Sequence, residues 1–163
     1  MYFIKNVILD LDNTLYNYDV CNDYALETTF KFLIKEYNLN IDIYEIYNLY
    51  YKINSDLKKI IPNTASSHNR TIYFKNLLKE LNISISEVIK IKEYYWNNFY
   101  SKMILFNDVL EFLEYISKNN INIYILTDFT LNEQLEKLKI LRIKITNFII
   151  LSIFSLRMLK IVQ

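Results

Sequence analysis

The sequence predicts an α/β fold in which a parallel sheet is interrupted by a block of helices. Three observations lead to this prediction. The apolar run "FIKNVIL" at residues 3–9 is rich in β-forming residues and is typical of a strand buried on both faces. From Asn17 to Met103 the apolar residues recur at helical spacing. After Phe106, helical and strand-like patterns alternate, which is the arrangement that gives a parallel sheet.

Length and composition suit one domain, or one core with an inserted subdomain. The chain has 163 residues, of which 52% are hydrophobic and 16% aromatic, so it has enough apolar material for a core. The formal net charge is +1, and this balance gives no reason to expect nucleic acid or an acidic membrane as a partner. Glycine is absent, which excludes phosphate-binding loops that depend on glycine.

The cysteine content and the sequences at the two ends of the chain indicate in which cellular compartment we expect the protein. The single Cys21 excludes a disulfide within the chain, and the first residues lack the apolar stretch of a signal peptide. We therefore expect a cytoplasmic protein. The apolar stretch at 145–162 is interrupted by Arg157 and Lys160, so we do not expect a membrane anchor there.

The insertion is expected to span residues 17–104. Trp96 and the tyrosines around it, Tyr94, Tyr95 and Tyr100, have helical spacing, and we expect them to pack helices against one another rather than to stack on a base. The polar segment "NTASSHN" at 63–69 is predicted as a loop. The first predicted helix stops at Tyr37–Asn38 and carries apolar residues at helical spacing: Ala25, Leu26, Phe30, Leu33 and Ile34. The other predicted helices span about Ile43–Ile60, Arg70–Leu81 and Ser86–Lys102, the last capped by Ser86.

Residues 1–16 and 105–163 are expected to form the α/β core. Asn107 or Asp108 can cap the first helix after the insertion. Besides the first strand, the predicted elements are a helix at 109–116, a strand at 121–126 that ends at Thr127-Asp128, a helix at about 131–141 and a strand at about 147–151.

The first predicted strand ends at two acidic residues, Asp10 and Asp12, in "VILDLDNTLY". Neighbouring carboxylates repel each other, and burial raises the free energy of ionising both, so a cation or a chemical role should compensate them. A calcium-binding EF-hand loop is excluded, because Leu15 and Cys21 occupy the positions that require glycine and glutamate. A simple turn at the end of a strand remains an alternative.

These acids carry a family resemblance. The segment "DLDNT" resembles motif I of the haloacid dehalogenase-like (HAD) hydrolases, and "YILTDFT" resembles their motif II. The helical block lies where this superfamily carries its type-1 cap. The segments "RTIYFKNLLKELNI" and "FNDVLEFLEYI" resemble the cap exit and core re-entry of the phosphatase and nucleotidase branches. The resemblance implies a Rossmann-like parallel sheet core with an inserted helical cap.

The resemblance also implies a Mg²⁺-dependent phosphatase acting on a small phosphorylated metabolite, with a nucleotide as one option. Asp10 would attack phosphorus and form an aspartyl-phosphate, while Asp12 would protonate the leaving group and later activate water. Mg²⁺ would bind Asp10 and the backbone carbonyl of Asp12. The Thr127 hydroxyl and the Asp128 backbone N–H would bind the phosphate. Dehalogenation is a minor option, because it needs neither Asp12 nor the metal.

The chain departs from the family pattern after "FIILS" at 148–152. Lys160 lies close to the expected lysine of motif III but lacks the flanking Gly and Pro, and the acidic pair of motif IV is absent. We therefore expect a truncated or degenerate member whose sheet is incomplete at the C-terminus. The first strand would then have an open edge available for self-association. A catalytically inactive binding or interaction protein is the alternative to an enzyme.

Overall fold

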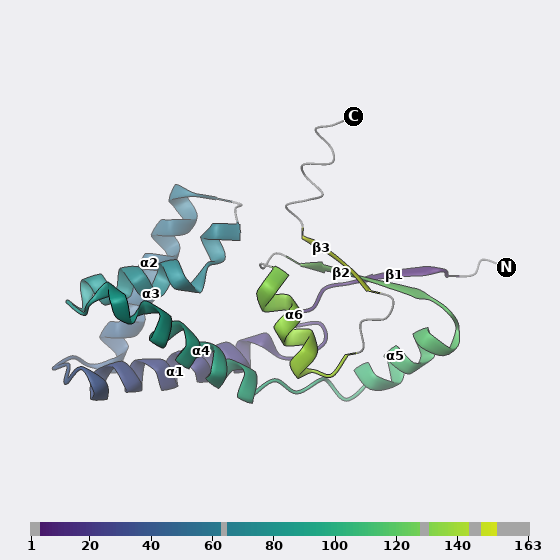
Figure 1. Cartoon of the computed structure of the whole chain (residues 1–163), viewed down its shortest axis with the longest axis horizontal. Helices are drawn as coiled ribbons and strands as arrows, with labels where there is room; N and C mark the ends of the chain where they lie inside the picture. Colours follow the sequence, from purple (N-terminus) through teal and green to yellow (C-terminus); the bar gives the residue numbers. More distant parts are fainter. Residues whose placement is uncertain (1–3, 63–64, 128–130, 144–147, 153–163) are drawn as a thin grey trace. The chain divides into compact units, whose positions relative to one another are not determined.

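The computed structural model describes residues 4–62, 65–127, 131–143 and 148–152 (Figure 1). The chain divides into two compact units. The core unit comprises Met1–Val20 and Met103–Gln163, and the helical unit comprises Cys21–Lys102. The expected border of the insertion, 17–104, and its assignment as a cap stay predictions.

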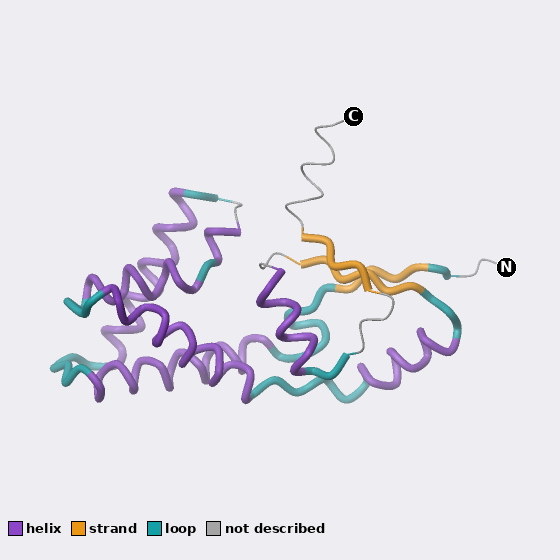
Figure 2. Tube along the Cα trace, in the orientation of Figure 1, coloured by secondary structure: helices purple, strands orange, loops and turns teal. Residues whose placement is uncertain are grey.

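The core unit contains a parallel sheet, drawn as orange strands in Figure 2. Its strands are β1 (Asn6–Leu9), β2 (Asn122–Thr127) and β3 (Phe148–Ser152), in the order β1-β2-β3. Both pairings are parallel, so the three carboxyl ends lie at one edge of the sheet. The predicted α/β class with a parallel sheet is confirmed.

One face of this sheet is covered by helices. The core unit's helices α5 (Val109–Lys118) and α6 (Leu131–Ile140) lie on the same side of the strands (Figure 1). The register pairs Val7 with Ile123 and Leu9 with Ile125, so these four side chains share a face. Ile123 and Ile125 are buried, which identifies their face as the covered one.

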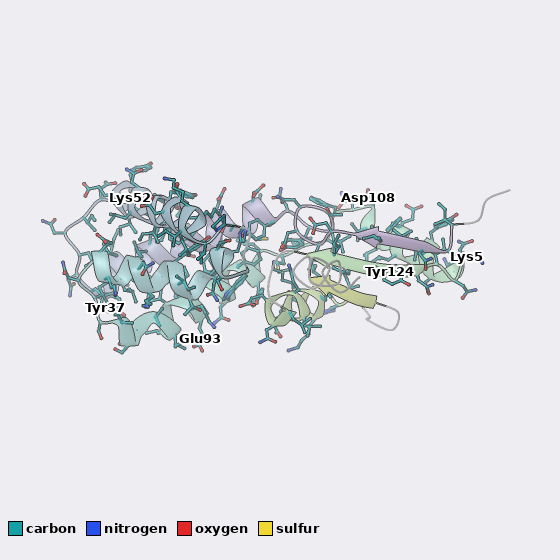
Figure 3. All side chains as sticks on the ribbon, turned by 90° about the horizontal axis from the view of Figure 1, so that it is seen from above. Lys5, Tyr37, Lys52, Glu93, Asp108 and Tyr124 are labelled. Atoms are coloured by element: carbon teal, nitrogen blue, oxygen red, sulfur yellow. The ribbon has the colours of Figure 1, made fainter. Side chains whose placement is uncertain are left out.

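The opposite face of β1 is open to solvent within the described residues. Ile8 is 64% exposed and Ile4 is 69% exposed. Ile8 pairs in register with Tyr124, which Figure 3 labels on the sheet, and Asn122 Nδ2 donates to Asn6 Oδ1 at 2.9 Å on the same face. The prediction that the strand at 3–9 is buried on both faces is wrong for its described part, because the described helices cover one face only.

The helical unit consists mainly of helices, and the α-helices lie close to their predicted positions. Ala65–His68, in the predicted loop at 63–69, form a short 3₁₀ helix. Ser86 does not cap the helix α4 (Val88–Ser101). It lies in the short 3₁₀ helix η2 (Ile85–Glu87), and its backbone N–H donates a hydrogen bond to the Ser84 side chain. No described helix combines the length and apolar character needed to cross a bilayer. The elements are α1 (Tyr18–Glu36), which begins in the core unit, α2 (Ile43–Ile60), η1 (Ala65–His68), α3 (Arg70–Glu80), η2 (Ile85–Glu87) and α4 (Val88–Ser101).

Aromatic side chains fill the interior of the helical unit. Tyr50 of α2 lies 5.7 Å from Tyr73 and 5.8 Å from Phe74, measured between ring centroids. Phe74 in turn lies 5.4 Å from Tyr95 of α4, and Tyr95 lies 5.1 Å from Trp96. Tyr95 and Trp96 are buried, so the prediction that these aromatics pack helices together is confirmed.

The helix ends show how a chain without glycine reverses direction. Asn38, Asn82, Asn120 and Arg142 follow α1, α3, α5 and α6, and each has a positive φ between 48° and 55°. The apolar residue after each one donates its backbone N–H to a carbonyl five residues earlier, as Ile83 does to Leu78 at 2.8 Å. This is the Schellman motif, with asparagine in three of the four positions where glycine is usual.

Candidate functional site

The two acids lie on a tight loop that follows β1. Leu11, between them, is completely buried and anchors the loop, while Asp10 is exposed and Asp12 is partly buried. The loop is closed by hydrogen bonds from the Leu11 N–H to Asp10 Oδ1 at 2.7 Å and from the Leu15 N–H to the Leu11 carbonyl at 3.0 Å. Burial therefore alternates along this loop, and the two acids are more accessible than the residue between them.

Asparagine side chains join this loop to the start of α1. Asn13 has a φ of 58°, a conformation that asparagine tolerates better than most residues. Its Oδ1 accepts from the Tyr18 N–H at 2.8 Å, and Asn17 Oδ1 accepts from the Val20 N–H at 3.0 Å. Both bonds satisfy N–H groups of the first helical turn. The loop that carries the acids is thus fixed to the helix that follows it.

Asp12 is the centre of a polar cluster. Lys137 Nζ of α6 lies 2.7 Å from Asp12 Oδ1 and 2.9 Å from Oδ2. Gln134 Nε2 donates to Oδ2 at 3.2 Å, and the Tyr16 hydroxyl donates to Oδ1. The side chain of Asp12 is 16% exposed and that of Lys137 is 0% exposed. The Lys137 ammonium also lies 5.4 Å from the ring centroid of Tyr18.

The hydrogen bonds and charges of this cluster compensate one another. A carboxylate offers about four lone-pair positions, and the four hydrogen bonds to Asp12 fill that capacity. A fully buried ammonium is costly unless a counter-charge accompanies it. Asp12 supplies that charge for Lys137, so the two residues depend on each other. Lys137 is one cation that offsets the repulsion expected between Asp10 and Asp12.

The carboxyl end of β2 lies beside the loop of the two acids. Leu9 is level with Ile125 in the register, and the backbone of Thr127 comes two residues later. Neighbouring parallel strands end at the same edge, which is where open α/β sheets bind ligands. The side chain of Thr127, together with Asp128 and Lys160, lies outside the described residues, so their roles stay predictions.

The acids suit Mg²⁺ held in part by the protein. Among the described residues there is no group of three or more acidic, histidine or cysteine side chains that could enclose a metal. Mg²⁺ usually binds one or two carboxylates plus substrate phosphates and keeps several waters, so it does not need such a group. Asp10 presents an exposed carboxylate. The contact expected from Asp12 uses its backbone carbonyl, which the side-chain pairing with Lys137 leaves unaffected.

A hollow of about 440 Å³ adjoins the loop but does not suit a phosphate. Its polar lining includes the carboxylates of Asp108 and Glu111, which would repel a phosphate dianion. Neither Asp10 nor Asp12 lines it. The lining residues are Leu9, Thr14, Leu15, Asp108, Val109, Glu111, Phe112 and Tyr115.

Sequence reasoning missed Tyr16, Gln134 and Lys137. It looked for a compensating lysine near the end of the chain, at Lys160, by analogy with the family. Gln134 and Lys137 are three residues apart on the helix after the second strand, a spacing that places both on one helix face. That spacing was the available signal. It was weak, because lysine is normally a surface residue.

Comparisons with known proteins agree with the fold. No family model matches the chain. The ribulose-1,5-bisphosphate 5-phosphatase of Halopiger xanaduensis is 30% identical over 152 residues, which cover 91% of this chain and 62% of that protein. A 2-haloacid dehalogenase of Pseudomonas syringae has a TM-score of 0.64 at 17% identity, and the match covers 92% of this chain and 64% of that one.

A third comparison concerns YfnB of Bacillus subtilis, described as a HAD-hydrolase bound to magnesium. It has a TM-score of 0.59 at 14% identity, and the match covers 90% of this chain and 65% of that one. The chain thus spans less than two thirds of the length of each of these three proteins. The chain therefore has the fold of haloacid dehalogenase-like hydrolases, as its resemblance to that superfamily implied, and it is similar in sequence to a phosphatase.

Proposed function

We propose that this chain is a Mg²⁺-dependent phosphatase whose nucleophile is Asp10, with the helical segment 17–104 as a type-1 cap. One observation carries the proposal: Asp10 and Asp12 follow β1 at the edge where β2 also ends. The 30% identity to a protein named as a phosphatase supports the same activity.

The proposed reaction has two displacements at phosphorus. In the first, an oxygen of the Asp10 carboxylate attacks phosphorus, the bond from phosphorus to the ester oxygen breaks, and the leaving alkoxide takes a proton from Asp12. In the second, the Asp12 carboxylate takes a proton from water, whose oxygen attacks phosphorus and releases Asp10. The net change is hydrolysis of a phosphate monoester to an alcohol and inorganic phosphate.

The residues contribute binding and positioning as well as proton transfer. Asp12 must release one of its four hydrogen-bond contacts before it can exchange a proton, because these contacts fill its acceptor capacity in the structure. Bound Mg²⁺ would neutralise charge on the phosphate oxygens. Asp10 and the backbone carbonyl of Asp12 would hold the metal, and Thr127 and Asp128 at the end of β2 would donate hydrogen bonds to the phosphate.

For the substrate we propose a small phosphorylated sugar, ahead of a nucleotide. The support is the curated relative, which is named for a sugar bisphosphate. We propose neither nucleic acid nor a membrane as a partner, because the net charge is +1. Cys21 is buried and is the single cysteine of the chain, which agrees with a cytoplasmic protein.

The test is a screen of phosphate monoesters, including ribulose-1,5-bisphosphate and a nucleoside monophosphate, with and without Mg²⁺. We expect Mg²⁺-dependent phosphate release that Asp10→Asn lowers by at least about 1,000-fold, because the amide is not a nucleophile. Asp56→Asn, at an exposed surface pair on α2, is the matched control and should leave the rate unchanged. Hydrolysis that survives Asp10→Asn would contradict the assignment of the nucleophile.

A catalytically inactive binding protein is the second candidate. The observation in its favour is that Lys137, Gln134 and Tyr16 occupy both oxygens of Asp12. An inactive protein would bind a sugar phosphate in calorimetry without releasing phosphate. Its affinity would be insensitive to Asp10→Asn if Asp10 has no role in binding.

A further inference from the structure

We propose that Lys137 is a positioning residue for the reaction, holding the carboxylate of Asp12 in its working orientation. The inference rests on the proposed function, because it concerns the proton-transfer residue of that reaction. It places on α6 the positive charge that the family resemblance led us to expect at Lys160.

The contact geometry supports a positioning role. Lys137 Nζ contacts both oxygens of Asp12, at 2.7 and 2.9 Å, so it restrains the carboxylate against rotation. Gln134 Nε2 and the Tyr16 hydroxyl donate to one oxygen each. Donors therefore reach the carboxylate from the loop and from the helix. Losing the Lys137 contacts would leave one donor at each oxygen.

Burial makes the contact persistent. Lys137 is 0% exposed, and the rings of Tyr16 and Tyr18 lie 6.0 and 5.4 Å from its ammonium. Water and salt therefore screen this pair much less than the surface pairs of the chain. Lys139, two residues later, is the contrast: its side chain is 74% exposed and it pairs with Glu136 on the surface.

A purely structural role is the competing explanation, since the same pair ties α6 to the loop after β1. The two explanations differ in what a substitution changes. A structural pair affects the free energy of unfolding. A positioning residue also lowers kcat in protein that is fully folded, and leaves KM nearly unchanged, because Lys137 supports the proton-transfer group rather than the substrate.

The experiment compares the full chain with Lys137→Met, Lys137→Arg and Lys139→Met in Mg²⁺-dependent hydrolysis, alongside thermal unfolding of each protein. Lys137→Met removes the charge at similar length, Lys137→Arg keeps the charge, and Lys139→Met is the matched control. We expect Lys137→Met to lower kcat roughly 100-fold with KM changed less than about 3-fold. Lys137→Arg should lower kcat less than Lys137→Met does, and Lys139→Met should have the kcat of the wild type.

The double variant Asp12→Asn/Lys137→Met keeps the test valid if a single variant folds poorly, because it buries a neutral pair. Its kcat should equal that of folded Asp12→Asn, since Lys137 acts on the reaction only through Asp12. An active wild type whose kcat is unchanged by Lys137→Met would overturn the inference alone. A wild type that hydrolyses none of the monoesters would overturn the proposed function and the positioning role with it.

Discussion

At the scale of single residues, the pairing of Asp12 with Lys137 changes how the site must be studied. The acid expected to transfer protons also balances a fully buried ammonium. Removing one partner of a buried pair typically costs about 3–5 kcal/mol of unfolding free energy. A loss of activity in Asp12→Ala would therefore mix chemistry with unfolding. Asp10, which is exposed, is the cleaner position for a test of catalysis.

Tyr50 provides a prediction at the same scale. Its hydroxyl is buried in the aromatic interior of the helical unit and has no hydrogen-bond partner among the described residues. Burial raises the pKa of Tyr50 above its usual 10.0. Tyr50→Phe removes the unsatisfied hydroxyl and should raise the free energy of unfolding by about 1 kcal/mol, measured by urea denaturation at neutral pH.

The sign of the pH effect follows from that raised pKa. Above pH 10 the unfolded chain loses the Tyr50 proton before the folded protein does, so stability falls as pH rises. Tyr50→Phe should lose less stability than the wild type between pH 8 and pH 11. The control for the measurement at neutral pH is Tyr73→Phe. This substitution removes a hydroxyl that donates to the Ser67 carbonyl, so it should lower the free energy of unfolding. A destabilised Tyr50→Phe would refute the prediction.

At the scale of helices and strands, local pattern predicted most of the fold. Helical periodicity located α2 at Ile43–Ile60, and the apolar runs located β2 and β3 to within a residue. The local pattern could not predict burial, because burial depends on what covers an element. Ile8, for example, is an apolar strand residue and is nevertheless exposed. The local pattern could not find the Asp12–Lys137 pair either, because the partners are 125 residues apart in sequence.

The helix ends lead to a prediction at this scale. Arg142 follows α6 with a φ of 54°, a conformation that costs a residue with a β-carbon about 1 kcal/mol. Arg142→Gly should therefore stabilise the chain by about 0.5–1 kcal/mol, measured by chemical denaturation. Asn82→Gly should stabilise the chain less than Arg142→Gly does, because asparagine tolerates this conformation. Lys139→Gly, inside α6, is the control and should destabilise.

Arg142→Gly and Asn82→Gly together separate two explanations of the positive φ angles. If the helix ends are strained because the chain lacks glycine, Arg142→Gly should raise the free energy of unfolding more than Asn82→Gly does. Equal or negative effects at both positions would mean that the side chains contribute contacts that outweigh the conformational cost.

At the scale of the whole molecule, the notable feature is the edge of the sheet at β1. In the part of the chain that the structure describes, β1 pairs with β2 and no strand pairs with its other side. Ile4 and Ile8 expose apolar side chains beside that edge. An exposed apolar edge strand is a template for another strand. We propose that two copies of this chain associate through β1, since each copy offers the same edge and a symmetric pair satisfies both.

Self-association through β1 should depend on protein concentration and on Ile8. We expect analytical ultracentrifugation of the wild type to show a monomer–dimer equilibrium, and Ile8→Lys to shift it to monomer, because a charge at the edge disfavours strand pairing. Ile60→Lys is the matched control: Ile60 is 75% exposed at the end of α2, and its substitution should leave the equilibrium unchanged. A dimer that persists in Ile8→Lys, or a wild type that stays monomeric at high concentration, would show that β1 does not bind a second copy. The aspartate site lies at the carboxyl end of the same strand, so a β1-mediated dimer would bring two such sites into one assembly.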